Sequence, residues 1–194
     1  MAIRIGIGLC LLLMATGCPV LSLQPLYEST DELVSRPDLL GKWIENEGDE
    51  NVIEFVAVND TSYRMIAREG DENLEFDVAI VEIRGQLFMD LLLEEPSGDA
   101  AMYSQNLHQF WAIDLSKDTL AVKALAGDWA KERSEKGRLW VRHVRIDDKT
   151  ILTAKPSRLQ RFVHKWGKDP EAFAEMFILH RVPPSKGDAK PSGQ

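Results

Sequence analysis

The chain has 194 residues, with 23 basic and 31 acidic side chains and a formal net charge of -8 at pH 7. This length, with a hydrophobic content of 44%, predicts one folded domain with a sizeable core. The acidic balance argues against a nucleic-acid partner, because nucleic-acid-binding proteins present a basic face to the phosphates.

The amino terminus has the features of an export signal. Arg4 is the only charged residue among the first 27, and an apolar run from Ile5 to Ala15 follows it. This run is shorter than the roughly 20 residues of a membrane-spanning helix, and small residues separate it from Cys18. We predict a cleaved signal peptide over residues 1–17.

Cys18 follows Ala15-Thr16-Gly17, which resembles a bacterial lipobox, although Leu is commoner than Ala at the first of these positions. The resemblance implies lipid attachment at Cys18, with acyl chains such as palmitate, and a membrane partner through that lipid. The other cysteine, Cys10, leaves with the signal peptide, so no disulfide remains. We expect a lipoprotein of the bacterial cell envelope. Pro19, where an Asp would indicate inner-membrane retention, favours the outer membrane, facing the periplasm.

Three regions follow the cleavage site. We interpret residues 18–38 as a lipidated tether, although Leu26 and Tyr27 could dock on the domain. Residues 39–182 form the expected β-barrel domain, and residues 183–194 a disordered tail rich in Pro, Gly and Lys.

Short β-rich runs separated by turn residues dominate the domain, which predicts an antiparallel meander. On residues 74–83, Leu74, Phe76, Val78 and Ile80 share one face. The fold class is therefore mainly β, a barrel of about 8 to 10 strands. The expected strands are residues 41–47, 52–58, 62–68, 74–83, 86–93, 107–115, 119–125, 139–146, 150–153 and 176–182.

Two helices interrupt the strands. The first is predicted over residues 128–136, with Gly137 after it. The second, over residues 156–166, has one apolar stripe, so we expect it to pack on the sheet. The same region carries basic residues and no acid. The basic residues of this region could face anionic lipid headgroups, but we favour a solvated outer face. They are Lys155, Arg158, Arg161, Lys165 and Lys168.

Gly41-Lys42-Trp43 opens the first expected strand. A G-x-W motif, a meander, an amphipathic helix and a closing strand resemble the lipocalin family. The resemblance implies that Trp43 plugs one barrel end beside a ligand cavity, and that a late arginine, Arg142 or Arg145, stacks over it. The alternative is a core Trp beside a turn Gly in another β fold, and the family's central T-D-Y signature is not found.

A second resemblance concerns processing alone. The segments Ser22-Leu23-Gln24-Pro25-Leu26-Tyr27 and Leu39-Leu40-Gly41, with Trp43, resemble the amino terminus of a group of uncharacterised bacterial lipoproteins. This resemblance implies no activity.

The pentapeptide Glu-Gly-Asp-Glu-Asn occurs at residues 47–51 and 69–73, and the loop 94–106 is acidic too. Strand parity predicts that all three cap the same barrel end, away from the membrane if the tether enters at the other end. We favour the simpler interpretation that Gly, Asp and Asn are present because they suit hairpin turns. The alternatives are weak calcium binding or capture of a basic partner, although a calcium-loop ligand ladder is missing.

Local motifs for catalysis are missing. The four histidines, at 108, 143, 164 and 180, stand on separate elements, although His143 and His180 could meet across strands, and the sequence has no H-E-x-x-H, nucleophile elbow or phosphate loop. We therefore expect no enzyme, no cofactor and no metal. Our leading interpretation is a lipid-anchored envelope lipoprotein that binds a small apolar or amphipathic ligand in its barrel. The alternative is a protein–protein interaction module of the envelope without a ligand cavity.

Overall fold

The computed structural model describes residues 20–69, 72–93, 106–147 and 149–183. The predicted signal peptide, Cys18 and residues 184–194 of the predicted tail lie outside these ranges. Within the described ranges, no helix combines the length and the apolar character needed to cross a membrane.

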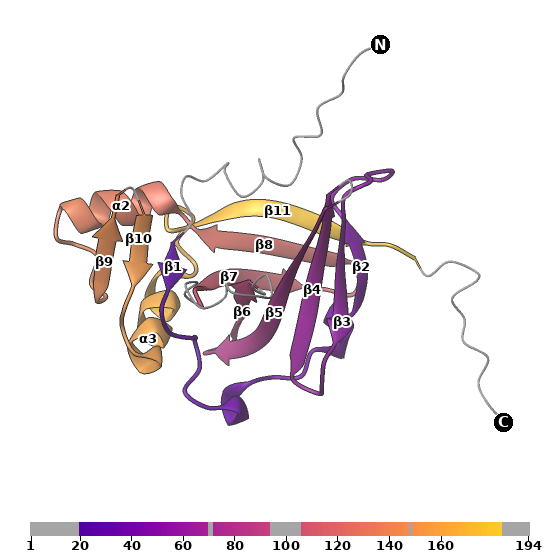
Figure 1. Cartoon of the computed structure of the whole chain (residues 1–194), viewed down its shortest axis with the longest axis horizontal. Helices are drawn as coiled ribbons and strands as arrows, with labels where there is room; N and C mark the ends of the chain where they lie inside the picture. The colour runs from indigo at the N-terminus through magenta and orange to yellow at the C-terminus, as the bar shows by residue number, and fades with distance from the viewer. Residues whose placement is uncertain (1–19, 70–71, 94–105, 148, 184–194) are drawn as a thin grey trace, which may run out of the picture.

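Eight antiparallel strands in the described residues form a closed barrel (Figure 1). They follow one another in chain order, and the last pairs with the first. The predicted mainly β meander barrel is thus confirmed. Its strands are β2 (Gly41–Ile44), β3 (Val52–Ala57), β4 (Ser62–Glu69), β5 (Glu72–Ile83), β6 (Gln86–Leu93), β7 (His108–Leu115), β8 (Thr119–Leu125) and β11 (Phe173–Arg181).

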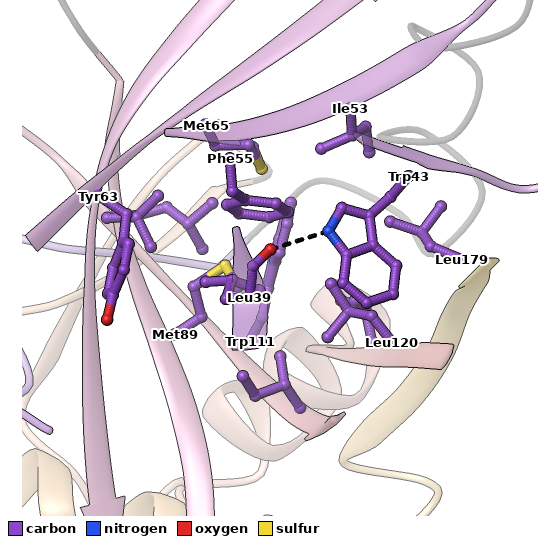
Figure 2. Close-up of a cluster of buried hydrophobic side chains, with 14 of the residues drawn as sticks. Leu39, Trp43, Ile53, Phe55, Tyr63, Met65, Met89, Trp111, Leu120 and Leu179 are labelled. Atoms are coloured by element: carbon purple, nitrogen blue, oxygen red, sulfur yellow. Dashed lines mark hydrogen bonds between the residues drawn. The ribbon is translucent and has the colours of Figure 1, made fainter. Parts of the chain in front are cut away.

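Side chains that alternate along the strands fill the barrel interior. Val78 and Ile80 of β5 point inward and are buried, as the period-2 pattern predicts. Trp111 of β7 packs edge-on against Phe177 of β11, with ring centroids 5.7 Å apart. Figure 2 shows how the large side chains of this inner cluster meet, among them Leu39, Trp43, Phe55, Tyr63, Met65 and Met89.

A small sheet of three strands continues from the barrel wall (Figure 1). β1 (Leu21–Ser22) pairs with the start of β7 and, in parallel, with β10 (Lys149–Leu152). β10 forms a hairpin with β9 (His143–Ile146). The sequence predicted a longer strand over residues 139–146, but β9 begins only at His143.

Both predicted helices are present. α2 spans Gly127–Glu135, and α3 spans Pro156–Trp166, with a proline in its first turn. The apolar stripe of α3 packs on the outer wall of the barrel and makes a second core there. Its buried members include Phe88, Phe110, Leu159, Phe162, Val163 and Phe173.

Residues 20–40, called the strap below, run along the outer wall before entering the barrel through η1 (Thr30–Glu32) and η2 (Pro37–Leu39). Leu26 is fully buried in the second core. Gln160 of α3 donates a hydrogen bond to the Leu26 carbonyl at 3.0 Å. Residues 20–38 of the segment interpreted as a tether are therefore part of the folded domain.

Candidate functional site

Among the described residues, the pocket beside Trp43 leaves little room for a ligand inside the barrel. A pocket between Trp43, Phe177 and Leu179 has a volume of about 40 Å³. Pockets that hold small molecules span roughly 300–1,000 Å³. Side chains, with Trp43 fully buried among them, occupy the space that a ligand would need.

Trp43, the expected barrel plug, is held by a hydrogen bond at the edge of its indole and by a cation over the ring face. Its Nε1 donates to the Leu39 carbonyl at 2.9 Å (Figure 2). The Arg181 guanidinium lies over the ring, 4.2 Å from the centroid. A late arginine does stack on Trp43, but the prediction of Arg142 or Arg145 is wrong: Arg145 pairs with Glu135 at 3.0 Å, and Arg142 lines a groove elsewhere.

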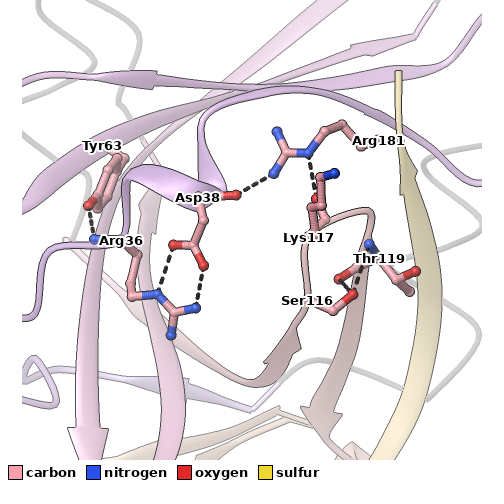
Figure 3. Close-up of polar contacts among 7 residues, drawn as sticks. All are labelled: Arg36, Asp38, Tyr63, Ser116, Lys117, Thr119 and Arg181. Atoms are coloured by element: carbon pink, nitrogen blue, oxygen red, sulfur yellow. Dashed lines mark hydrogen bonds and ion pairs between the residues drawn. The ribbon is translucent and has the colours of Figure 1, made fainter. Parts of the chain in front are cut away.

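Arg181 also joins the strap to the barrel (Figure 3). Its donors reach the carbonyls of Leu40 at 2.6 Å, Lys117 at 2.8 Å and Asp38. Gly41 stands beside it with φ of +114°, and a Cβ there would lie 3.2 Å from Arg181 Nη1. The G-x-W motif thus supplies the backbone freedom and the space that this arginine requires.

A buried carboxylate holds the strap at its other end. Asp90, on the outer face of β6, is 3% exposed. Its two oxygens accept hydrogen bonds from the Leu26 N–H at 2.6 Å and from His108 Nδ1 at 2.6 Å. Burial and the nearby Asp90 and Asp77 carboxylates raise the pKa of Tyr27, the next residue of the strap. Because both Asp90 oxygens are used in this way, we assign the pair to structure.

A large hollow lies outside the barrel, between α3, the segment 139–142 and the end of β10. It has a volume of about 840 Å³. We call it the basic groove. Its lining residues are Gln24, Leu139, Trp140, Val141, Arg142, Thr153, Ala154, Lys155, Arg158, Arg161, Phe162, Lys165 and Trp166.

Five of these residues are cations, all of them exposed, and none of the thirteen is acidic. Aromatic rings stand among the cations. Trp140 is 76% exposed, and Lys165 Nζ lies 4.0 Å from its ring centroid and 4.7 Å from that of Trp166. Such a groove can pair cations with phosphate or carboxylate groups and place an apolar or ring-shaped portion on the indoles.

A stacked cluster supports the groove from behind. Arg133 of α2 lies 4.4 Å from the Trp166 ring and 4.7 Å from that of Trp129. The two indoles meet edge-on, 5.2 Å apart. α2 therefore fixes Trp166, so the groove wall is preorganised.

The sequence identified four of the five groove cations, on and before α3, but not their partners. Trp140 and Arg142 were assigned to a strand interior, and only the fold brings them to α3. Lys168, grouped with the cations from sequence, is absent from the groove lining. Leu139 and Val141 are buried while Trp140 between them is 76% exposed, an alternation that composition alone does not reveal.

The remaining candidates do not converge. In the described part of the chain, no group of three or more His, Cys, Asp or Glu side chains could hold a metal ion. His143 bonds to Ser134 at 2.8 Å, whereas His180 lies in β11 opposite Thr119 and Ile44, so the two histidines do not meet.

The acidic loops meet at one barrel end, because Val52 after the first loop lies opposite Arg68 before the second. The chain enters the barrel at the opposite end, as expected, because Gly41 at the start of β2 pairs with Phe55 near the end of β3. The strap nevertheless starts at the acidic end, because β1 pairs with His108, where β7 begins. Most of loop 94–106 lies outside the described residues. The acidic loops therefore lie at the barrel end nearest β1, not at the end away from it.

Comparison with protein-family models, with curated proteins and with solved structures finds no match for this chain.

Proposed function

We propose that this protein is a lipid-anchored lipoprotein of the bacterial cell envelope, on the outer membrane facing the periplasm, and that it binds an anionic amphiphile in the basic groove. In this proposal the barrel is a scaffold. The carrying observation is the contrast between an 840 Å³ groove with five cations and no acid, and a 40 Å³ pocket in the barrel.

The chemistry of the groove lining supports an amphiphile rather than a simple anion. Arg142, Arg158 and Arg161 offer guanidinium groups, which pair well with phosphate and carboxylate oxygens. Trp140 and Phe162 line the same groove, and their apolar surface gains free energy when a ligand covers it. A protein with a net charge of -8 repels anions in general, so this local excess of cations is selective.

The lipid anchor rests on the sequence around Cys18. Small residues directly before the cysteine, the short apolar run and the absence of a second cysteine in the mature chain support it. Two or three acyl chains hold a protein stably on a bilayer, whereas one gives marginal binding. Catalysis forms no part of the proposal.

Short-chain lipids test the groove directly. The mature chain carrying Cys18→Ser is titrated with monomeric dihexanoyl phosphatidylglycerol, and with dihexanoyl phosphatidylcholine for comparison, while tryptophan fluorescence is followed. We expect saturable binding of the anionic lipid, weakened by the double variant Arg158→Gln/Arg161→Gln. The matched control Lys42→Gln/Lys123→Gln removes the same charge from exposed positions on the barrel strands.

Two results would contradict the proposal. One is equal binding of both lipids, and the other is equal loss of binding in the groove variant and the barrel control. Retained binding in the groove variant together with loss in a Trp43→Phe variant would return the site to the barrel interior.

A further inference from the structure

We propose that the exposed face of the β1–β10–β9 sheet, together with the basic groove, lies flat on the anionic membrane leaflet that holds the lipid of Cys18. This inference rests on the proposed function. It names the partner of the groove as the phospholipid surface itself, and it fixes how the domain is oriented on that surface.

The chain leaves almost no distance between the lipid and this sheet. Leu21, the first residue of β1, pairs with Ile151 of β10 and stands three residues after Cys18. Three residues span at most about 10 Å. Lipid on Cys18 would therefore hold this sheet, rather than a distant part of the barrel, against the bilayer.

Strand register separates the two faces of the small sheet. Val144 lies opposite Ile151, which pairs in turn with Leu21, so the three side chains share one face. α2 covers the other face, where Ser134 bonds to His143 at 2.8 Å and Glu135 to Arg145 at 3.0 Å. α2 does not cover the face that carries Val144.

On this face the edge strand β9 and the residue after β1 present exposed apolar side chains, whereas Ile151 between them is buried. Val144 is 44% exposed and Ile146, two residues further on the same face, is 56% exposed. Leu23 directly after β1 is 39% exposed. Transfer of such exposed aliphatic side chains from water to the boundary between headgroups and acyl chains of a bilayer is favourable.

The basic groove continues this face. Thr153 N–H donates to the Arg142 carbonyl at 2.9 Å, which extends the β9–β10 ladder to two lining residues of the groove. Exposed aliphatics, a tryptophan that is 76% exposed and five cations thus adjoin one another. This combination is typical of surfaces that lie at a membrane interface, where tryptophan sits among headgroups and cations pair with anionic lipids.

The sign of the charge in the groove selects the surface that it can face. Its lining has five cations and no acid, which attract an anionic leaflet. A basic segment of another protein would not fit the groove, because its charge has the same sign.

Vesicle binding tests the orientation without the lipid anchor. The mature chain with Cys18→Ser is sedimented with vesicles of phosphatidylcholine alone or mixed with phosphatidylglycerol. We expect binding to the mixed vesicles, reduced about 30-fold by Arg158→Gln/Arg161→Gln, since each cation near such a surface contributes about fivefold. We expect Val144→Ser/Ile146→Ser to reduce it about tenfold, from the apolar area withdrawn from the interface.

The barrel offers matched controls. Val56 and Val58 are 37% and 57% exposed on the β3 side, so Val56→Ser/Val58→Ser removes comparable apolar surface elsewhere. Lys42→Gln/Lys123→Gln controls for charge. Brominated acyl chains in the vesicles should quench the fluorescence of the wild-type chain, and Trp140→Phe should lose most of that quenching. Unchanged thermal midpoints verify that each variant is folded.

The outcomes separate this inference from the proposed function. Binding of monomeric dihexanoyl phosphatidylglycerol without binding of mixed vesicles would overturn the orientation and leave the groove as a soluble-ligand site. Failure of both probes would overturn both proposals. Equal vesicle binding by the Val144/Ile146 and Val56/Val58 variants would also refute the orientation.

Discussion

Removing the guanidinium of Arg181 should destabilise the whole domain, because this side chain is shared by the strap, the β7–β8 turn and Trp43. The cation–π contact at 4.2 Å is worth about 1 kcal/mol at a partly buried site. Hydrogen bonds from a charged donor, here at 2.6 Å to Leu40 and 2.8 Å to Lys117, contribute about 1 kcal/mol each after discounting for solvent. We therefore expect Arg181→Ala to lower the free energy of unfolding by about 3 kcal/mol.

Urea unfolding followed by far-UV circular dichroism measures this loss independently of tryptophan emission. For a chain of this size, about 3 kcal/mol corresponds to a drop in the melting midpoint of roughly 6–12 °C. Arg181→Lys keeps the charge near Trp43 and loses most of the directed hydrogen bonds, so its cost should be intermediate. Arg142→Ala, which removes an exposed groove cation, should cost less than about 0.5 kcal/mol. A near-neutral Arg181→Ala, or an equal cost for Arg142→Ala, would refute the reasoning.

Three further predictions concern the strap, the anchor and acid stability. Leu26→Ala should cost about 2–5 kcal/mol in urea unfolding, because Leu26 is fully buried, whereas exposed Leu23→Ala should be close to neutral. Cells fed labelled palmitate should label the wild-type chain and not Cys18→Ser; label on the variant would disprove the attachment site. Arg36 lowers the pKa of Asp38 from 3.8, so its stabilisation is present above about pH 3.8 and is lost as pH falls through the folded-state pKa. Asp38→Asn should weaken the dependence of the unfolding free energy on pH below that value. It should leave this dependence unchanged near neutrality.

Local patterns in the sequence determined the elements that depend on periodicity. The stripe of α3 predicted its bounds, residues 156–166, because apolar residues at helical spacing need only one neighbouring surface. The turn at Arg84-Gly85 was also predictable: both residues have positive φ, and Ile83 pairs with Gln86 across a two-residue hairpin.

Features that depend on long-range contacts could not be found in this way. The Leu26 backbone bonds to Asp90, 64 positions away, and to Gln160, and its side chain is buried in the second core. Nothing in the local sequence of the strap, with its Pro and polar residues, distinguishes it from a linker. The arginine over Trp43 was expected near position 142, but β9 and β10 belong to the small sheet and not to the barrel. Only strand order reveals that Arg181 is the one that lies beside Trp43.

The groove illustrates the same limit. Its cations on α3 form a sequence cluster, but the value of that cluster depends on Trp140 and Arg142, which stand before β9. A helix face that only contacts water and one that lines a binding groove can have the same composition. The residues opposite α3 determine which of the two it is.

The closure of the barrel by β11 bears on when the protein can fold. β11 pairs with β8 on one side and with β2, near the other end of the chain, so the barrel cannot close until Phe173–Arg181 is available. β1 likewise cannot pair with β10 until residues 149–152 have been synthesised. Contacts of such long sequence separation slow folding, often to milliseconds or seconds. A chain still emerging from a ribosome would thus stay open along its length, and folding would follow its release.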